Sequence, residues 1–128
     1  MPFFSELVQQ TEAARLGLLS VPIIQGCLRG EVSVPSYVAF LTQAYHHVRH
    51  TVPLLQACQA ALRPEHVWLR PALDEYVSEE QGHDEWILDD IRACGADAEG
   101  VRDGDPAIPV EVMVAYAYDT IARRNPLG

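Results

Sequence analysis

Apolar residues recur along the chain at a spacing close to 3.6, and proline and glycine interrupt the pattern at intervals. No segment shows the clear alternation of apolar and polar residues that is typical of a half-buried strand. Because a repeat near 3.6 matches a helix with one buried face, the segments between the breaks are expected to be helices. The sequence therefore predicts an all-α fold, and its 128 residues suit a single domain, residues 1–128.

The breaks divide the chain into five predicted helical segments. They are Phe3–Leu19 with Ser5 as its expected N-cap, a short helix from Pro22 that stops at Gly30, a long helix from Ser33 to Leu62, a second long helix from Pro64 to Cys94, and Val110–Arg124. Pro53 is expected to kink the first long helix, because proline lacks the N–H that bonds to the preceding turn. Pro71 is a further candidate break, and residues 95–109 are expected to form a polar loop.

Charge and composition exclude several classes of protein. The net charge is -9, with 18 acidic residues against 9 arginines and no lysine, so the basic surface required for nucleic acid or for anionic membranes is missing. The N-terminus lacks a basic, signal-peptide-like start, and no apolar run reaches membrane-spanning length. Three cysteines without CxxC spacing indicate neither a disulfide framework nor a zinc knuckle. We expect a soluble, cytoplasmic protein.

The main functional signal is a polar pair in an otherwise apolar or aromatic stripe of the second long helix. Steps of three and four residues give Leu73, Tyr76, Glu80, His83, Ile87, Ile91 and Cys94. A buried carboxylate is costly unless it is paired or bound to a cation. Glu-x-x-His is also the half-site used by four-helix di-iron proteins. Glu80 and His83 are therefore candidate metal ligands. Two alternatives stay open, a Glu80–His83 hydrogen-bonded pair and a Glu80–arginine ion pair from another helix.

Neighbouring acids and histidines receive different assignments. Glu79, Asp84, Asp89 and Asp90 lie off the stripe and are expected to be solvated. The apolar face of the first long helix is formed by Val38, Leu41, Tyr45, Val48, Val52 and Leu55. His46 and His50 lie opposite this face, so they are expected at the surface, and replacing them with glutamine should have little effect on stability. His47 lies on the flank, either as a polar core residue or lining a cavity between helices.

Three segments in this order resemble a known superfamily: QAYHHVRHTVPLL, EEQGHDEWILDDI and VAYAYDTIARRNP. They are similar to the N-terminal half of the heme-oxygenase-like iron-containing redox proteins, which also include TenA-type thiaminases and the coenzyme PQQ synthase. The resemblance implies a heme-oxygenase-like (TenA-like) helical bundle. It places Glu80 and His83 as ligands of non-heme iron, in a di-iron centre. It also implies that Ala44, His47 and Thr51 line the active-site cavity, and Tyr76 is expected there too.

Departures from the relatives narrow the function. Thiaminases carry an aspartate where this chain has Ala44, so thiamine chemistry is not expected. Heme oxygenases hold heme through a histidine on the first helix, and residues 3–20 contain none, so no heme is expected.

Family members are about twice as long as this chain, and their second half supplies further ligands. The chain is therefore expected to be either a fragment or a half-length protein that pairs, most simply as a homodimer, because a half-bundle exposes a large apolar face. One hypothesis is part of a non-heme iron oxidase or oxygenase, inactive alone, that acts on a small molecule, with an apolar compound as one option. The alternative is a metal-free helical binding or dimerisation module of the same fold.

Overall fold

The computed structural model describes residues 2–127, and every regular element in this part of the chain is a helix, which confirms the all-α prediction. None of these helices has the length and apolar character needed to cross a bilayer. In chain order the elements are α1 (Pro2–Leu19), α2 (Pro22–Leu28), α3 (Val34–Val48), α4 (Thr51–Ala61), the 3-10 helix η1 (Pro64–Leu69), α5 (Arg70–Glu80), α6 (His83–Ala93), α7 (Ala98–Asp103) and α8 (Ile108–Arg123).

The predicted domain 1–128 contains two compact units, Met1–Tyr37 and Val38–Gly128. The first unit holds α1, α2 and the first residues of α3, and no residue of α1 is buried. Because α1 begins at Pro2, Ser5 lies inside the helix and the N-cap prediction was wrong. Every candidate site residue lies in the second unit.

The helix expected through the QAYHHVRH segment is interrupted at Arg49 and His50, between α3 and α4. Pro53 explains the position of this break, because it offers no N–H to the carbonyl of Arg49 four residues earlier. The His50 amide bonds to the carbonyl of His47, three residues earlier, at 3.0 Å. The turn after α3 is therefore tighter than a turn of α-helix. The predicted kink is therefore confirmed, one turn before the proline.

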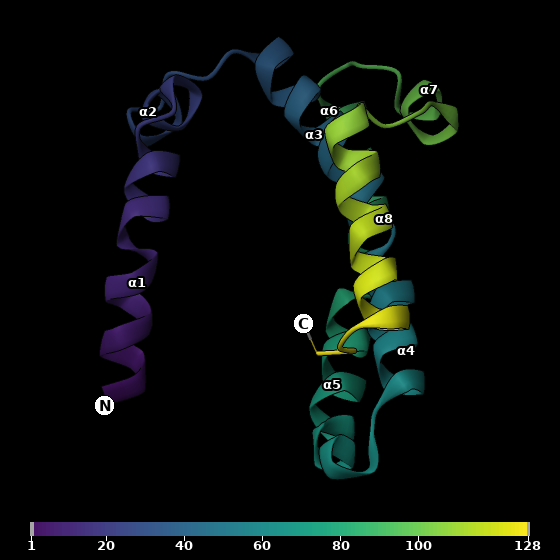
Figure 1. Cartoon of the computed structure of the whole chain (residues 1–128). Coiled ribbons are helices and arrows are strands. Elements are labelled where there is room, and N and C mark those ends of the chain that lie inside the picture. Colours follow the sequence, from purple (N-terminus) through teal and green to yellow (C-terminus); the bar gives the residue numbers. More distant parts are fainter. Residues whose placement is uncertain (1, 128) are drawn as a thin grey trace. The chain divides into compact units, whose positions relative to one another are not determined.

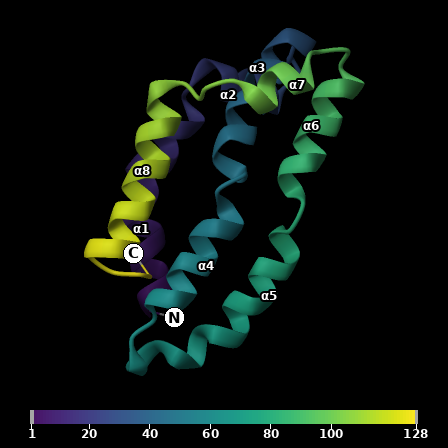
Figure 2. The same ribbon diagram turned by 90° about the vertical axis from the view of Figure 1, so that its right-hand side faces the viewer.

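The second long helix, expected from Pro64 to Cys94, is divided twice. α5 starts at Arg70, so Pro71 lies in its first turn, where a missing N–H leaves no bond unmade. A second interruption at Gln81 and Gly82 separates α5 from α6, and the prediction of continuous helix here was wrong. Gly82 has φ +85°, a conformation that glycine adopts readily. Figure 2 shows α5 and α6 as two rods joined by this turn.

The hydrophobic core of the second unit joins α3, α6 and α7. It consists of Leu41, Tyr45, Leu88, Ile91 and Ala98. α7 forms in the segment predicted to be a polar loop, because Asp97 caps it by accepting a 2.9 Å hydrogen bond from the Gly100 amide. Arg102 of α7 then donates two 2.9 Å bonds to Glu85 of α6. These contacts hold α7 against α6.

The other half of the unit is built on α4, which packs against both α5 and α8. Figures 1 and 2 show these three helices side by side, with α4 in the middle in Figure 2. The apolar face predicted for α3 and α4 is inward: Leu41 and Tyr45 are buried, and its other four members are half-buried. Each helix that carries a candidate site residue therefore packs against at least one other helix of the second unit.

Candidate functional site

Glu80 and His83 come together at the junction of two helices. Glu80 is the last residue of α5 and His83 is the first of α6, with the Gln81–Gly82 turn between them. The Oε2 atom of Glu80 lies 3.0 Å from Nδ1 of His83. Their side chains are 21% and 32% exposed, respectively. The two predicted ligands thus adjoin one another, although they do not share one continuous helix and are not fully buried.

The contact restricts where the proton of the His83 imidazole can lie. A carboxylate only accepts hydrogen bonds, so a hydrogen bond between the two side chains requires the proton on Nδ1 of His83. Among residues 2–127, Nε2 of His83 has no hydrogen-bond partner. This is the hydrogen-bonded pair that the sequence left open as an alternative to a metal site. It is also the arrangement in which a carboxylate orients a metal-binding histidine.

Trp86, one turn further along α6, lies against the imidazole of His83. The two ring centroids are 4.6 Å apart and the ring planes are tilted by 36°. The indole is nevertheless 64% exposed, so most of its surface has no protein cover. Two side chains therefore restrict the His83 ring, one at its edge and one at its face. Sequence reasoning did not single out Trp86, although its i, i+3 spacing from His83 was the available signal.

The acids around the pair are mostly solvated, as predicted. Glu79, Asp89 and Asp90 are exposed, and Asp89 accepts a 2.7 Å bond from Arg92. Asp84 differs, because it is half-buried in the first turn of α6. No arginine contacts Glu80 in the described part of the chain, so the alternative of a Glu80–arginine pair is not found.

An apolar pocket of about 300 Å³ lies between α4, α5 and α8, and residues after α8 form part of its wall. Tyr76, on the turn of α5 before Glu80, is part of its wall. The other lining residues are Leu54, Leu55, Cys58, Leu73, Ala117, Ile121, Pro126 and Leu127. Burial raises the pKa of the Cys58 thiol, so this wall stays uncharged. Tyr76 thus lines this pocket, and its place in an active-site cavity stays a prediction.

The other three residues expected in a cavity lie elsewhere on α3 and α4. Ala44 is buried, and His47 and Thr51 are half-buried. The Nδ1 atom of His47 lies 3.4 Å from the carbonyl of Gln43, within its own helix. None of the three lines the pocket between α4, α5 and α8 or the pocket beside His46 and His50. Their assignment to an active-site cavity stays a prediction.

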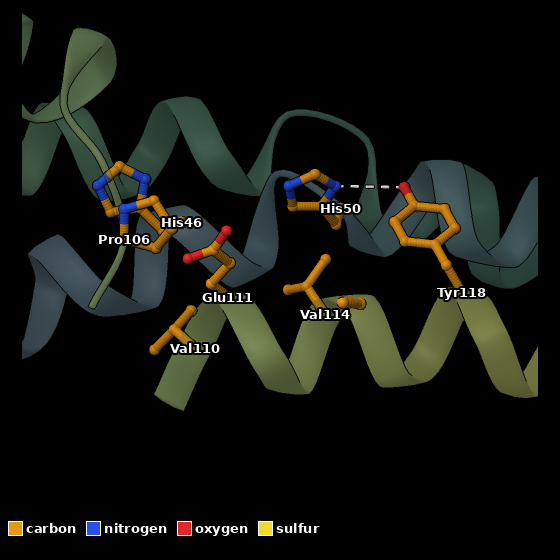
Figure 3. Close-up of a pocket in the computed structure, with 8 residues that line it drawn as sticks. His46, His50, Pro106, Val110, Glu111, Val114 and Tyr118 are labelled. Carbon is orange, nitrogen blue, oxygen red and sulfur yellow. Dashed lines mark hydrogen bonds between the residues drawn. The ribbon is translucent and has the colours of Figure 1, made fainter. Parts of the chain in front are cut away.

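His46 and His50 are not surface residues, and that prediction was wrong. His46 is only 4% exposed, and His50 is half-buried with Nδ1 3.2 Å from the Tyr118 hydroxyl. Both line a second pocket of about 300 Å³, whose remaining walls are Pro106, Val110, Glu111, Val114, Ala115 and Tyr118. Figure 3 shows the two imidazoles facing α8, which covers the side of α3 that lacks apolar residues. Val110, Val114 and Tyr118, at helical spacing in α8, were the signal for this second contact.

Both of these histidines are disposed to stay neutral. Burial lowers the pKa of His46 most, and the nearby Arg49 guanidinium lowers it further, against an opposing effect of Asp105. Burial and Arg49 lower the pKa of His50 in the same way. A neutral imidazole suits a hydrogen bond with Tyr118 in an apolar surrounding.

Glu80 and His83 are the donor types that non-heme iron accepts, a carboxylate and an imidazole. Within residues 2–127, no group of three or more His, Cys, Asp or Glu side chains lies close enough to hold a metal ion. The pair therefore fits part of an iron site, and further ligands must come from outside the described part of one copy.

Comparison with known proteins shows which family the second unit resembles. No curated protein and no solved structure matches the chain. The model of one protein family, described as iron-containing redox enzyme, matches residues 38–128, the residues that form the second compact unit. This match covers most of the chain and includes both the α5–α6 junction and the two pockets. The protein belongs to the heme-oxygenase-like family of iron-containing redox enzymes.

Proposed function

We propose that the chain is part of a non-heme iron-dependent oxidase or oxygenase, in a di-iron centre to which Glu80 and His83 supply ligands. The observation that carries the proposal is the 3.0 Å carboxylate–imidazole contact at the α5–α6 junction, inside the segment matched by the iron-containing family. When bound, iron would supply a redox centre with open positions for dioxygen.

The two side chains act together in this proposal. Oε2 of Glu80 and Nδ1 of His83 lie 3.0 Å apart, so one ion could be bound by both atoms once the proton between them leaves. The second oxygen of Glu80 would then be available to the second ion of a di-iron centre. Because both side chains are partly exposed, a metal can reach them without unfolding the junction.

The substrate in this proposal is a small apolar molecule. Support comes from the apolar pocket of about 300 Å³, whose wall includes Tyr76 one turn before Glu80. A cavity lined by apolar side chains holds apolar ligands by excluding water from them. Tyr76 provides one hydroxyl in that wall, and it could orient a polar end of the substrate.

The iron site is completed by other protein, either a second copy or the C-terminal half that this family carries. A bundle-type di-iron centre needs about six ligands from four helices, and one copy offers Glu80 and His83. Exposed apolar side chains on α6 and α8 support association: Trp86, Val112 and Tyr116 are 64%, 60% and 59% exposed. A two-fold homodimer would place two Glu80–His83 pairs about one axis.

A metal-free helical binding or dimerisation module is the second candidate. It is favoured by the Glu80–His83 hydrogen bond, which pairs the two side chains without a metal, and by the lack of a three-residue cluster within residues 2–127. In this case the same exposed side chains would contact a partner without chemistry.

Anaerobic Fe(II) titration together with solution mass separates the two. The enzyme proposal expects Fe(II) binding that collapses in Glu80→Ala and His83→Ala and persists in the controls Glu79→Ala and Asp84→Ala. A monomer should bind weakly, and a dimer or a complex with the C-terminal half should bind in whole-number stoichiometry per site. An assembled dimer without iron would favour the module. A monomer that holds two irons would contradict the need for further protein.

A further inference from the structure

We propose that the pocket between α3 and α8 binds a small neutral molecule with an aromatic body and one hydroxyl group, that is, a phenol. His46 would bond to the hydroxyl, and apolar side chains of α8 would pack against the ring. The observation that carries the proposal is a buried histidine without a hydrogen-bond partner in the wall of a pocket of about 300 Å³. The pocket shares no residue with the Glu80–His83 pair or with the pocket that Tyr76 lines, so the proposal is independent of the iron site.

Three polar side chains, Gln43, His46 and His50, form a stripe toward α8 at steps of three and four residues. The two outer members bond to the α8 segment. Oε1 of Gln43 accepts the Ala107 amide at 2.9 Å, directly before α8 begins. Nδ1 of His50 lies 3.2 Å from the Tyr118 hydroxyl, near the other end of α8. His46 lies between these two contacts and opens onto the pocket, as Figure 3 shows.

His46 is the member of the stripe whose polar atoms have no partner. The residue is only 4% exposed, yet neither ring nitrogen makes a hydrogen bond within residues 2–127. Its contact with Tyr45 is an edge-on ring contact, with centroids 5.4 Å apart. Across the pocket α8 presents Val110 and Val114, which cannot bond to an imidazole. Because buried polar side chains are nearly always hydrogen-bonded, the unpaired nitrogens indicate a partner that enters the pocket.

The pocket has the size and lining of a small-molecule site. α8 packs closely against α4, whereas its contact with α3 is loose, and this leaves the space beside His46. Small-molecule sites begin at about 300 Å³ and combine mainly apolar walls with a few polar groups. The rings of His50 and Tyr118 lie in the wall, with centroids 5.8 Å apart and planes at 87°. Aromatic walls of this kind pack well against an aromatic ligand.

Charges around the pocket favour a neutral ligand. The Glu111 carboxylate lines the pocket and Asp105 lies near His46, so an anion would be repelled. Burial and then the Arg49 guanidinium lower the pKa of His46 and of His50, so a cation would meet the same positive field of Arg49. Both imidazoles are therefore neutral near pH 7, with one donor and one acceptor each. A hydroxyl group donates and accepts, so it fits either nitrogen of His46.

NMR of the full-length, metal-free chain tests the site, with phenol as the probe and toluene as the probe without a hydroxyl. Two alanines of α8 report on the two pockets: Ala115 lines the pocket beside His46, and Ala117 lines the pocket of Tyr76. With alanine methyl groups labelled, phenol should shift the Ala115 signal in a saturable way and leave the Ala117 signal in place. A shift of Ala117 alone would put phenol in the other pocket and overturn the proposal.

His46→Phe keeps a ring of similar size and removes both nitrogens. This variant should bind phenol about 5- to 10-fold more weakly, the change expected from one lost hydrogen bond, and should bind toluene as before. His66→Phe is the matched control. Nδ1 of His66 is also buried without a partner, but His66 lines neither pocket, so both affinities should be unchanged.

Ala115→Leu keeps the test decisive if His46→Phe does not fold. Ala115 is an exposed helical position in the pocket wall, so a larger side chain fits the helix and takes up space in the pocket. Binding of both probes should be lost while the circular dichroism spectrum stays the same. The proposal is overturned if phenol gives no saturable shift, as a pocket that holds only water would, or if neither variant weakens phenol binding. Since no metal is present, these results leave the proposed iron site untouched.

Discussion

Two histidine-bearing regions of the second unit differ in how much protein covers them. His46 of α3 is 4% exposed, and His50, in the turn between α3 and α4, bonds to Tyr118 of α8, 68 residues further along the chain. At the α5–α6 junction, the side chain of His83 is 32% exposed, and its contacts with Glu80 and Trp86 are both local.

The difference separates histidines that stabilise the fold from a histidine that can still bind a metal ion. Burial lowers the pKa values of His46 and His50, and His50 contributes to the packing of α8 through its bond to Tyr118. His83 keeps one ring nitrogen without a protein partner among residues 2–127 and has an open side. A site that awaits a metal ion or a partner chain should show the second pattern.

The largest expected effect is on stability, and it compares the two regions directly. His46→Ala should lower the free energy of unfolding by about 2–3 kcal/mol, because it leaves a cavity under α8. His83→Ala should lower it by less than about 1 kcal/mol, since the lost contacts are partly exposed. Urea unfolding followed by circular dichroism measures both. Equal losses would remove the distinction between the two regions.

The fate of these histidines shows what a single sequence can predict. The inward face of α3 followed from the spacing of Leu41 and Tyr45, and the break near Pro53 followed from proline chemistry. The burial of His46 could not be predicted in this way. Helical spacing identifies one apolar face of α3, whereas two faces of this helix are covered by other residues. The second cover comes from α8, whose Tyr118 contacts His50 across 68 residues of sequence. The spacing of Val110, Val114 and Tyr118 indicates an inward face of α8, but it does not show which helix that face contacts.

The two central residues of the candidate site could be predicted from the sequence, but the backbone turn between them and their neighbours could not. The pairing of Glu80 and His83 followed from their spacing and their place in an apolar stripe. The turn at Gly82 did not, because glycine is tolerated inside a helix and only the structure shows its φ of +85°. Trp86 was also missed, because its i, i+3 spacing from His83 permits a contact but does not by itself show that the two rings pack together.

Removing the Tyr118 hydroxyl tests the long-range contact with a smaller change. Tyr118→Phe deletes the 3.2 Å bond to Nδ1 of His50 and keeps the ring. We expect the free energy of unfolding to fall by about 1 kcal/mol, the usual contribution of one hydrogen bond. Tyr116→Phe, on an exposed part of α8, is the matched control and should change nothing measurable. A neutral Tyr118→Phe would mean that packing alone holds α8 on α3.

Acid should weaken the α3 region in a defined pH range. Because burial and Arg49 lower the pKa of His46 and His50 in the folded protein, the unfolded chain takes up protons first as pH falls. The contribution of these residues to stability is therefore present above the unfolded value of about 6.5 and is lost as pH falls from there toward the folded pKa. Urea midpoints between pH 7.5 and 5 should decrease, and less so in His50→Gln. An unchanged slope in that variant would show that His50 takes no part.

The smallest expected effect concerns the acids beside His83. It tests whether the candidate metal site includes any acid besides Glu80. Glu79 is exposed and Asp84 is half-buried next to His83. Glu79→Gln and Asp84→Asn should each change the free energy of unfolding by less than about 0.5 kcal/mol, as surface substitutions usually do. Fe(II) affinity should also be unchanged, because neither side chain belongs to the Glu80–His83 pair. A loss of affinity in Asp84→Asn alone would make Asp84 a third donor of the same copy. The site would then need fewer ligands from other protein than the pair by itself requires.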